Sequence, residues 1–131
     1  GTNHRLDLSS GILIKDNHLT NKQLDNLIQN VKLKNKSNFP IEVEVDTFEQ
    51  LEIILNIGVD AVLLDNMKPE QVRHAVEIIR NHPNGNNMYI ETSGGINLSN
   101  IEPYLHTGVD GISIGELTHS IKAAELHIEF A

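Results

Sequence analysis

The chain has 131 residues, 39% of them hydrophobic and 4% aromatic, and its formal net charge is −8. This composition fits one domain of ordinary size or part of a larger one. Nucleic acids and anionic membranes attract cationic proteins, so we expect neither as a partner. With no Cys and no run of 18 apolar residues, the chain offers no disulfide, thiolate metal site or spanning segment, and we expect a cytoplasmic protein.

Short apolar runs alternate with amphipathic segments along the chain. Strands are predicted over 11–15, 41–46, 61–66, 88–93 and 111–115. Helices are predicted over 21–32, 47–58, 68–80 and 99–106, with a weak helix from Thr118 onward. The helix at 47–58 begins on a capping-box pattern and stops at Gly58. This order is typical of βα units with a parallel sheet.

The strand ends recur at the length of one βα unit. Lys15, Glu44, Asp65, Ser93 and Gly115 are 29, 21, 28 and 22 residues apart. The spacing predicts an α/β fold, a partial (β/α) TIM-like barrel with about five parallel strands. A doubly wound open sheet is the rival, but no G-x-G-x-x-G follows the first strand. Because a closed barrel has eight strands, we expect upstream strands to be missing.

Charged side chains follow the apolar strands at these ends. Alternation places Glu42, Glu44 and Asp46 on one face of their strand, and by the same parity Asp65 shares a face with Leu63. If these faces point into the barrel, Lys15 and two carboxylates meet near its rim, where hard oxygen ligands hold a divalent cation or sugar hydroxyls. If they point outward, the carboxylates are merely solvated, and the pattern leaves both readings open.

Glycines at the last two strand ends form a second feature. Ser93 ends the fourth predicted strand and is followed by Gly94 and Gly95, and Gly115 ends the fifth, three residues before Thr118. Glycine lets backbone amides approach an anion closely, and barrels often bind phosphate at their last strand ends. Tight turns that need a positive φ would select the same residues, so the two explanations are about equally favoured.

Histidines and the basic loop carry less information. No zincin spacing occurs among the seven His, which disfavours a transition-metal site. His4 and Arg5, and His18 after the first strand, could recognise a carboxylate or phosphate. The basic run at 32–37 is most simply a solvated loop.

The segments "NHRLDL", "LIKDNH", "VEVEVDT", "GVDAVLLDNMKPEQV", "ETSGGINLSNI" and "TGVDGISIGELTHS" together resemble the quinolinate phosphoribosyltransferase family, also called nicotinate-nucleotide pyrophosphorylase. The ordered match covers nearly the whole chain. It implies a pentosyltransferase of NAD biosynthesis that joins quinolinate to phosphoribosyl pyrophosphate with Mg2+, releasing pyrophosphate and CO2 to give nicotinate mononucleotide. Residues 1–131 would be the C-terminal portion of the barrel domain, without the family's N-terminal domain and upstream barrel segments.

The resemblance also implies roles for individual residues. Cationic groups would meet the quinolinate carboxylates or the pyrophosphate, and carboxylates would hold ribose hydroxyls and the metal. A cradle of small residues would bind phosphate. The cationic groups would be His4, Arg5 and Lys15, and the carboxylates would be Glu44 and Asp65. The phosphate cradle would consist of Ser93, Gly94, Gly95 and Gly115, with His119 close by.

Some residues depart from the family pattern. Asp7 stands where the family has Gly, and the family has an acidic residue near Ser10. Glu116 stands where a small residue is usual after the last strand glycine. Members are dimers in which the partner's N-terminal domain covers the site. We therefore expect this chain alone to be inactive, and its open edges to favour a homodimer, a higher oligomer or poor solubility. A ModD-like relative of less certain substrate and a non-catalytic structural fragment are the alternatives.

Overall fold

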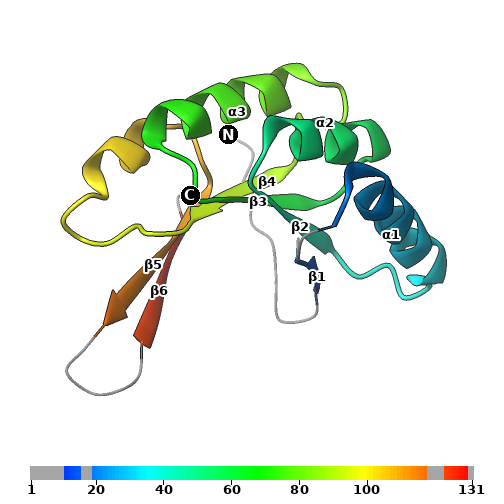
Figure 1. Cartoon of the computed structure of the whole chain (residues 1–131), viewed down its shortest axis with the longest axis horizontal. Helices are drawn as coiled ribbons and strands as arrows, with labels where there is room; N and C mark the ends of the chain where they lie inside the picture. The colour runs from blue at the N-terminus through cyan, green and yellow to red at the C-terminus, as the bar shows by residue number, and fades with distance from the viewer. Residues whose placement is uncertain (1–10, 16–18, 118–122, 130–131) are drawn as a thin grey trace.

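The computed structural model describes residues 11–15, 19–117 and 123–129, apart from the side chains of 116–117 and 123–127. Its elements are β1 (Ile12–Ile14), α1 (Asn21–Lys34), β2 (Ile41–Val45), α2 (Phe48–Ile57), β3 (Ala61–Asp65), α3 (Pro69–Asn81), β4 (Tyr89–Ser93), the 3-10 helix η2 (Glu102–His106), β5 (Gly111–Leu117) and β6 (Ala123–Glu129). The six strands form one sheet in chain order (Figure 1). Neighbours are parallel from β1 to β5, and β6 runs antiparallel to β5.

The first two helices begin where the sequence predicts, for a local reason. At α2, Thr47 Oγ1 accepts a hydrogen bond from Gln50 N at 3.2 Å, and Gln50 Oε1 accepts one from Thr47 N at 3.2 Å. Thr20 and Gln23 form the same capping box at α1. Each box satisfies amides that the first helical turn leaves without partners.

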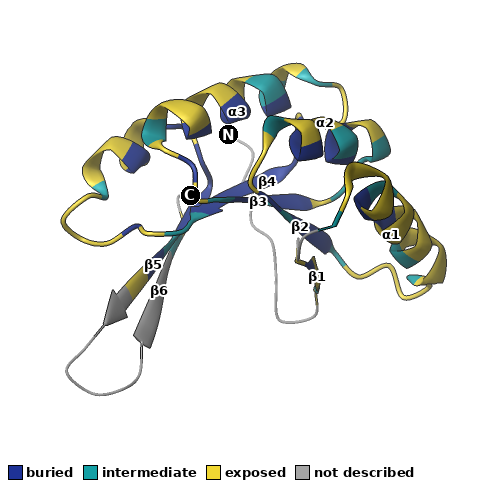
Figure 2. Ribbon diagram, viewed as in Figure 1, coloured by how far each residue is buried: buried dark blue, intermediate teal, exposed yellow. Residues whose placement is uncertain are grey.

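The helices cover one face of the sheet. In Figure 1, α1, α2 and α3 lie on the same side of the central strands, and Figure 2 shows that their buried residues face the sheet. The core contains Val43, Val62 and Leu64 from the helix-facing side of β2 and β3. Since side chains alternate, Glu42, Glu44 and Asp65 project from the opposite face. Over the described residues the sheet is a row of parallel βα units that does not close on itself, and this confirms the predicted partial barrel.

The predicted C-terminal helix is wrong over the residues that the structure describes. Ala123–Glu129 is strand β6, and its register with β5 runs from Gly111 opposite Glu129 to Leu117 opposite Ala123. This segment begins with good helix formers, but pairing with β5 satisfies the backbone groups of a strand that would otherwise be an edge. Tertiary pairing therefore overrides local propensity, and it adds an antiparallel sixth strand to the five parallel strands that the sequence predicted.

Two other boundaries differ from the prediction. The helix expected over 99–106 is only a 3-10 turn at Glu102–His106, because Asn97 Oδ1 captures the amides of Ser99 and Asn100 at 2.9 and 3.1 Å. At the other end of the chain, α1 continues into the basic run as far as Lys34. Within it, Lys32 Nζ donates to the carbonyl of Gly58 at 2.8 Å, so this cation stabilises the end of α2.

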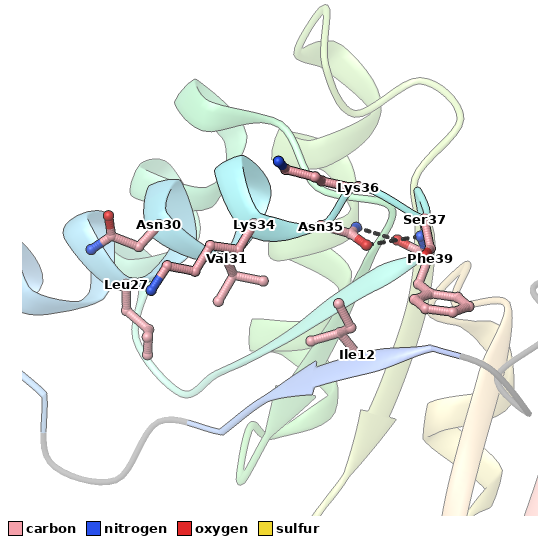
Figure 3. Close-up of a pocket in the computed structure, with 9 residues that line it drawn as sticks. All are labelled: Ile12, Leu27, Asn30, Val31, Lys34, Asn35, Lys36, Ser37 and Phe39. Carbon is pink, nitrogen blue, oxygen red and sulfur yellow. Dashed lines mark hydrogen bonds between the residues drawn. The ribbon is translucent and has the colours of Figure 1, made fainter.

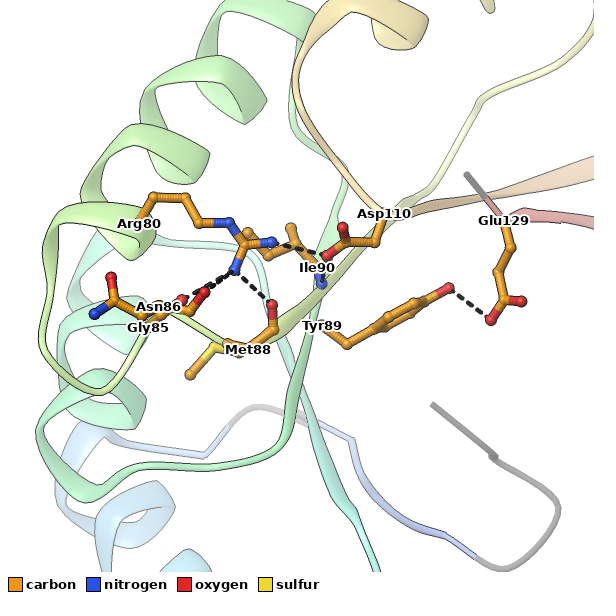
Figure 4. A network of polar contacts seen from close by, with 8 residues as sticks. All are labelled: Arg80, Gly85, Asn86, Met88, Tyr89, Ile90, Asp110 and Glu129. Carbon is orange, nitrogen blue, oxygen red and sulfur yellow. Dashed lines mark hydrogen bonds and ion pairs between the residues drawn. The ribbon is translucent and has the colours of Figure 1, made fainter. Parts of the chain in front are cut away.

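Arg80 organises the turn between α3 and β4 (Figure 4). Its Nη1 donates to the carbonyls of Gly85 and Met88 at 2.9 and 2.7 Å, and its Nη2 lies 2.9 Å from Asp110 Oδ2. The same Asp110 oxygen accepts from Ile90 N at 2.8 Å. The sequence did not reveal this network, because its members are up to 30 residues apart.

Replacing Arg80 by Ala should lower the free energy of unfolding by about 3 kcal/mol, because the largely buried Asp110 loses its counter-charge and two carbonyls lose a donor. Urea denaturation of the purified variant measures the change. Arg73→Ala, an exposed cation of the same helix, is the matched control. Equal losses in the two variants would contradict a specific role for Arg80.

Candidate functional site

The candidate site lies at the carboxyl ends of the parallel strands, on the face away from the helices. Asp65 at the end of β3 is paired with Ser93 at the end of β4. Glu44 of β2 is paired with Leu63, so it lies one side chain deeper on the same face. From the sequence, Lys15, Glu44 and Asp65 were expected at the same height along the strands, near the rim. The structure instead brings Asp65 and Ser93 together and staggers Glu44, while Lys15 follows β1 as an exposed residue.

The carboxylate of Asp65 is oriented from two sides. Ser93 Oγ donates to Asp65 Oδ1 at 3.2 Å, and Asn66 Nδ2 lies 3.4 Å from Asp65 Oδ2. Asp65 itself is partly buried. A carboxylate oxygen can accept more than one hydrogen bond, so both oxygens of Asp65 retain capacity for a ligand. Sequence reasoning identified Asp65 and Ser93 but missed Asn66.

The turn after β4 has the conformation that the double glycine suggested. Gly94 and Gly95 have φ of 93° and 70°. A Cβ added at Gly94 would lie 2.6 Å from Asn66 Oδ1 and 2.8 Å from Asp65 Oδ1, which is too close for any real side chain. At Gly95 and Gly115 an added Cβ would meet none of the described residues within 4 Å, so among these residues both glycines have space around them. The amide of Gly115 donates to the Ile96 carbonyl at 3.3 Å.

Gly94→Ala should reduce the free energy of unfolding by about 2 kcal/mol, since it combines an unfavourable positive φ with contact against Asp65 and Asn66. Gly95→Ala shares the positive φ without the contact, and we expect it to lower the free energy of unfolding by only about 1 kcal/mol. Parallel urea titrations compare the two variants. A Gly95 variant as unstable as the Gly94 variant would show that conformation, not the close approach, selects glycine here.

Two buried carboxyl groups lie deeper on the same face. Glu42 and Glu91 are each only 5% exposed. Ser113 Oγ donates to Glu91 Oε2 at 2.9 Å, whereas Glu42 Oε2 accepts no hydrogen bond from the described residues. Burial raises the pKa of Glu42 to about 7, with smaller contributions from the negative charges of Glu91 and Glu44. Alternation in the sequence placed Glu42 on this face, but nothing singled out Glu91.

The described residues fit a metal only as part of a shared site. Within them, no three His, Asp or Glu side chains lie close enough together to hold an ion. Glu44 and Asp65 do offer hard oxygen ligands from adjacent strands. Mg2+ is commonly bound by one or two carboxylates together with substrate phosphates and water. The pair therefore suits Mg2+ that arrives with a phosphorylated substrate.

Three predicted site residues are not described, and an apolar groove lies apart from those that are. His4, Arg5 and His119 are outside the described residues. The groove runs between β1 and α1, and Ile12 and Val31 contribute to its lining (Figure 3). None of the described candidate site residues lines it. Among the described helices, none is both long and apolar enough to cross a membrane.

Parallel βα units, an unclosed sheet and polar groups at the strand ends define part of a (β/α) barrel with a carboxyl-end site. The family model described as "Quinolinate phosphoribosyl transferase, C-terminal domain" matches residues 1–129, so the chain belongs to this family.

Individual relatives agree with the family match. A probable carboxylating nicotinate-nucleotide pyrophosphorylase of Methanocaldococcus jannaschii is 37% identical over 131 residues, covering 98% of this chain and 46% of the relative. A carboxylating nicotinate-nucleotide pyrophosphorylase of Mycobacterium leprae is 35% identical, with 98% and 45% covered. The crystal structure of NadC from Streptococcus pyogenes superposes with a TM-score of 0.71 at 30% identity, covering 100% of this chain and 46% of that one. The chain thus spans less than half the length of these relatives.

Proposed function

We propose that the chain forms the C-terminal barrel portion of a longer enzyme that transfers phosphoribose from phosphoribosyl pyrophosphate to quinolinate. Pyrophosphate and CO2 leave, and nicotinate mononucleotide enters NAD biosynthesis. Family membership supports the reaction class, and relatives named carboxylating nicotinate-nucleotide pyrophosphorylases support the substrate. The observation that supports the proposal most directly is the Asp65 carboxylate, which accepts a hydrogen bond from Ser93 Oγ and lies beside a glycine turn whose second residue, Gly95, has room around it among the described residues.

The roles of individual side chains follow from their chemistry. Lys15, with His4 and Arg5, supplies positive charge for the quinolinate carboxylates or the pyrophosphate. Glu44 and Asp65 bind ribose hydroxyls and Mg2+, which when bound neutralises charge on the departing pyrophosphate. The same carboxylates orient the ribose and stabilise positive charge as it develops on the sugar.

A phosphate cradle completes the proposed site. It consists of Ser93, Gly94, Gly95 and Gly115, together with His119. The space at Gly95 and Gly115 supports it, because none of the described side chains would block the approach of a phosphate to the backbone there. The hydrogen bond from the Gly115 amide to Ile96 leaves Gly115 to contribute room more than a donor.

Assembly completes the proposal. The face that carries Glu42, Glu44 and Asp65 has no covering helix among the described elements. Further strands of the longer chain would close the barrel over it, and a homodimer or higher oligomer would shield its remaining surface. We place the enzyme in the cytoplasm, in keeping with a chain that has no Cys.

Two measurements test the proposed function. Pyrophosphate release by the full-length protein should depend on quinolinate, and release that ignores quinolinate would point to another acceptor, as in a ModD-like protein. Calorimetry of the 131-residue chain with phosphoribosyl pyrophosphate and Mg2+ asks whether this portion binds alone. A full-length protein that neither binds the co-substrate nor releases pyrophosphate would show a purely structural role.

A further inference from the structure

We propose that Asn66 is a positioning residue that fixes the carboxylate of Asp65 and joins it to the Gly94 turn. The proposal rests on the proposed function, in which Asp65 binds ribose and metal. Asn66 acts through Asp65 and Gly94 and does not itself contact the substrate. Three features of Asn66 carry it: its backbone conformation, its hydrogen bonds and its packing.

The backbone of Asn66 is held in the left-handed region. Its φ is 57°, and among the described residues only Asn38 shares a positive φ without being glycine. Such a conformation costs on the order of 1 kcal/mol for a residue with a Cβ. Asn38 lies before β2, at the opposite end of the strands, so the two asparagines have the same conformation in different surroundings. The conformation alone would be served as well by glycine, and a side chain at position 66 therefore calls for a second reason.

Hydrogen bonds supply that reason. The amide of Asn66 donates to the Ser93 carbonyl at 3.1 Å, which extends the β3–β4 ladder one step past the Asp65–Ser93 pair. Its side-chain Nδ2 lies 3.4 Å from Asp65 Oδ2, a long hydrogen bond, while Ser93 Oγ holds the other oxygen at 3.2 Å. Donors on two sides restrict rotation of the carboxyl group, and a ligand then meets it already oriented.

Packing links Asn66 to the glycine turn. The space that a Cβ on Gly94 would occupy lies 2.6 Å from Asn66 Oδ1 and 2.7 Å from Asn66 N. Asn66 therefore lies against the Gly94 backbone on one side and Asp65 on the other. Asn66 thus holds the Asp65 carboxylate, assigned to ribose and metal, at a fixed position relative to the Gly94 turn, assigned to phosphate.

Asn66→Gly in the full-length protein separates positioning from turn formation. Glycine keeps the left-handed backbone at little cost and removes only the side chain. We expect thermal stability close to wild type, a fall of about 10-fold in kcat/KM for phosphoribosyl pyrophosphate, and a higher half-saturating Mg2+ concentration. Asn66→Asp, which puts a like charge beside Asp65, should lose about 100-fold. Asn38→Gly is the matched control and should change none of these values.

Crystal structures of wild type and Asn66→Gly provide a readout that does not need activity. The Asp65 carboxylate should turn away from its wild-type orientation when Nδ2 is removed. An Asp65 that keeps its orientation, or unchanged kcat/KM and Mg2+ dependence in Asn66→Gly, would overturn the proposal. If wild type does not turn over quinolinate, the proposed function fails, while the orientation of Asp65 in the two structures still decides the role of Asn66.

Discussion

Asp65→Asn in the full-length protein should lower kcat/KM for phosphoribosyl transfer by roughly 100-fold or more. The substitution preserves size and leaves an oxygen that can accept from Ser93 Oγ, now 3.2 Å from Asp65 Oδ1, so the fold should persist. What is lost is a negative charge, together with the preference of Mg2+ for a carboxylate oxygen. Steady-state assays at varied phosphoribosyl pyrophosphate and Mg2+ measure the loss.

Two companions make the Asp65 result specific. Glu44→Gln removes the neighbouring carboxylate from β2 and should cause a loss of similar size, because both groups are assigned to ribose and metal. Asp25→Asn makes the same chemical change on α1, on the helix side of the sheet, and should leave the kinetics unchanged. Full activity in Asp65→Asn or Glu44→Gln would remove that residue from the proposed site.

Glu42→Gln should make the 131-residue chain more stable at pH 8 by roughly 2–3 kcal/mol. In the folded chain, burial and the charges of Glu91 and Glu44 raise the pKa of Glu42 to about 7, from an ordinary value of 4.5. The folded state therefore holds a proton between these two pH values that the unfolded state releases. Stability from the protonated group is fully present below pH 4.5 and is lost as pH rises through 7. Gln is neutral throughout and does not incur that loss.

The measurement is the difference in unfolding free energy between Glu42→Gln and wild type, taken by urea denaturation at several pH values from 5 to 8.5. Using the difference cancels titrations that both chains share. We expect it to grow as pH rises. Glu77→Gln removes an exposed carboxylate of α3 and should give a small, nearly constant difference. If the free energies of unfolding of Glu42→Gln and wild type changed in parallel with pH, ionisation of Glu42 would not destabilise the folded chain.

Features that depend on near neighbours in the chain could be predicted from the sequence. The Thr47–Gln50 capping box and the strand periodicity are local interactions, so the order of βα units and most element bounds follow from them. Alternation likewise placed Glu42 and Glu44 on a common face. The family resemblance implied roles for the strand-end residues, and the family model confirms the family itself. The roles of Lys15 and the other strand-end residues remain predictions.

Which distant residues become partners depends on the tertiary fold. The alternation of residues in β2 could not show which face meets the helices. Val43 packs in the core beneath the helices, so Glu42 and Glu44 lie on the other face of the sheet. Strand β6 formed because the edge of β5 offers backbone partners that no propensity records. The stagger of Glu44 against Asp65 follows from strand register. These outcomes share one physical reason: hydrogen bonding and burial between distant segments depend on positions in space that the local sequence does not encode.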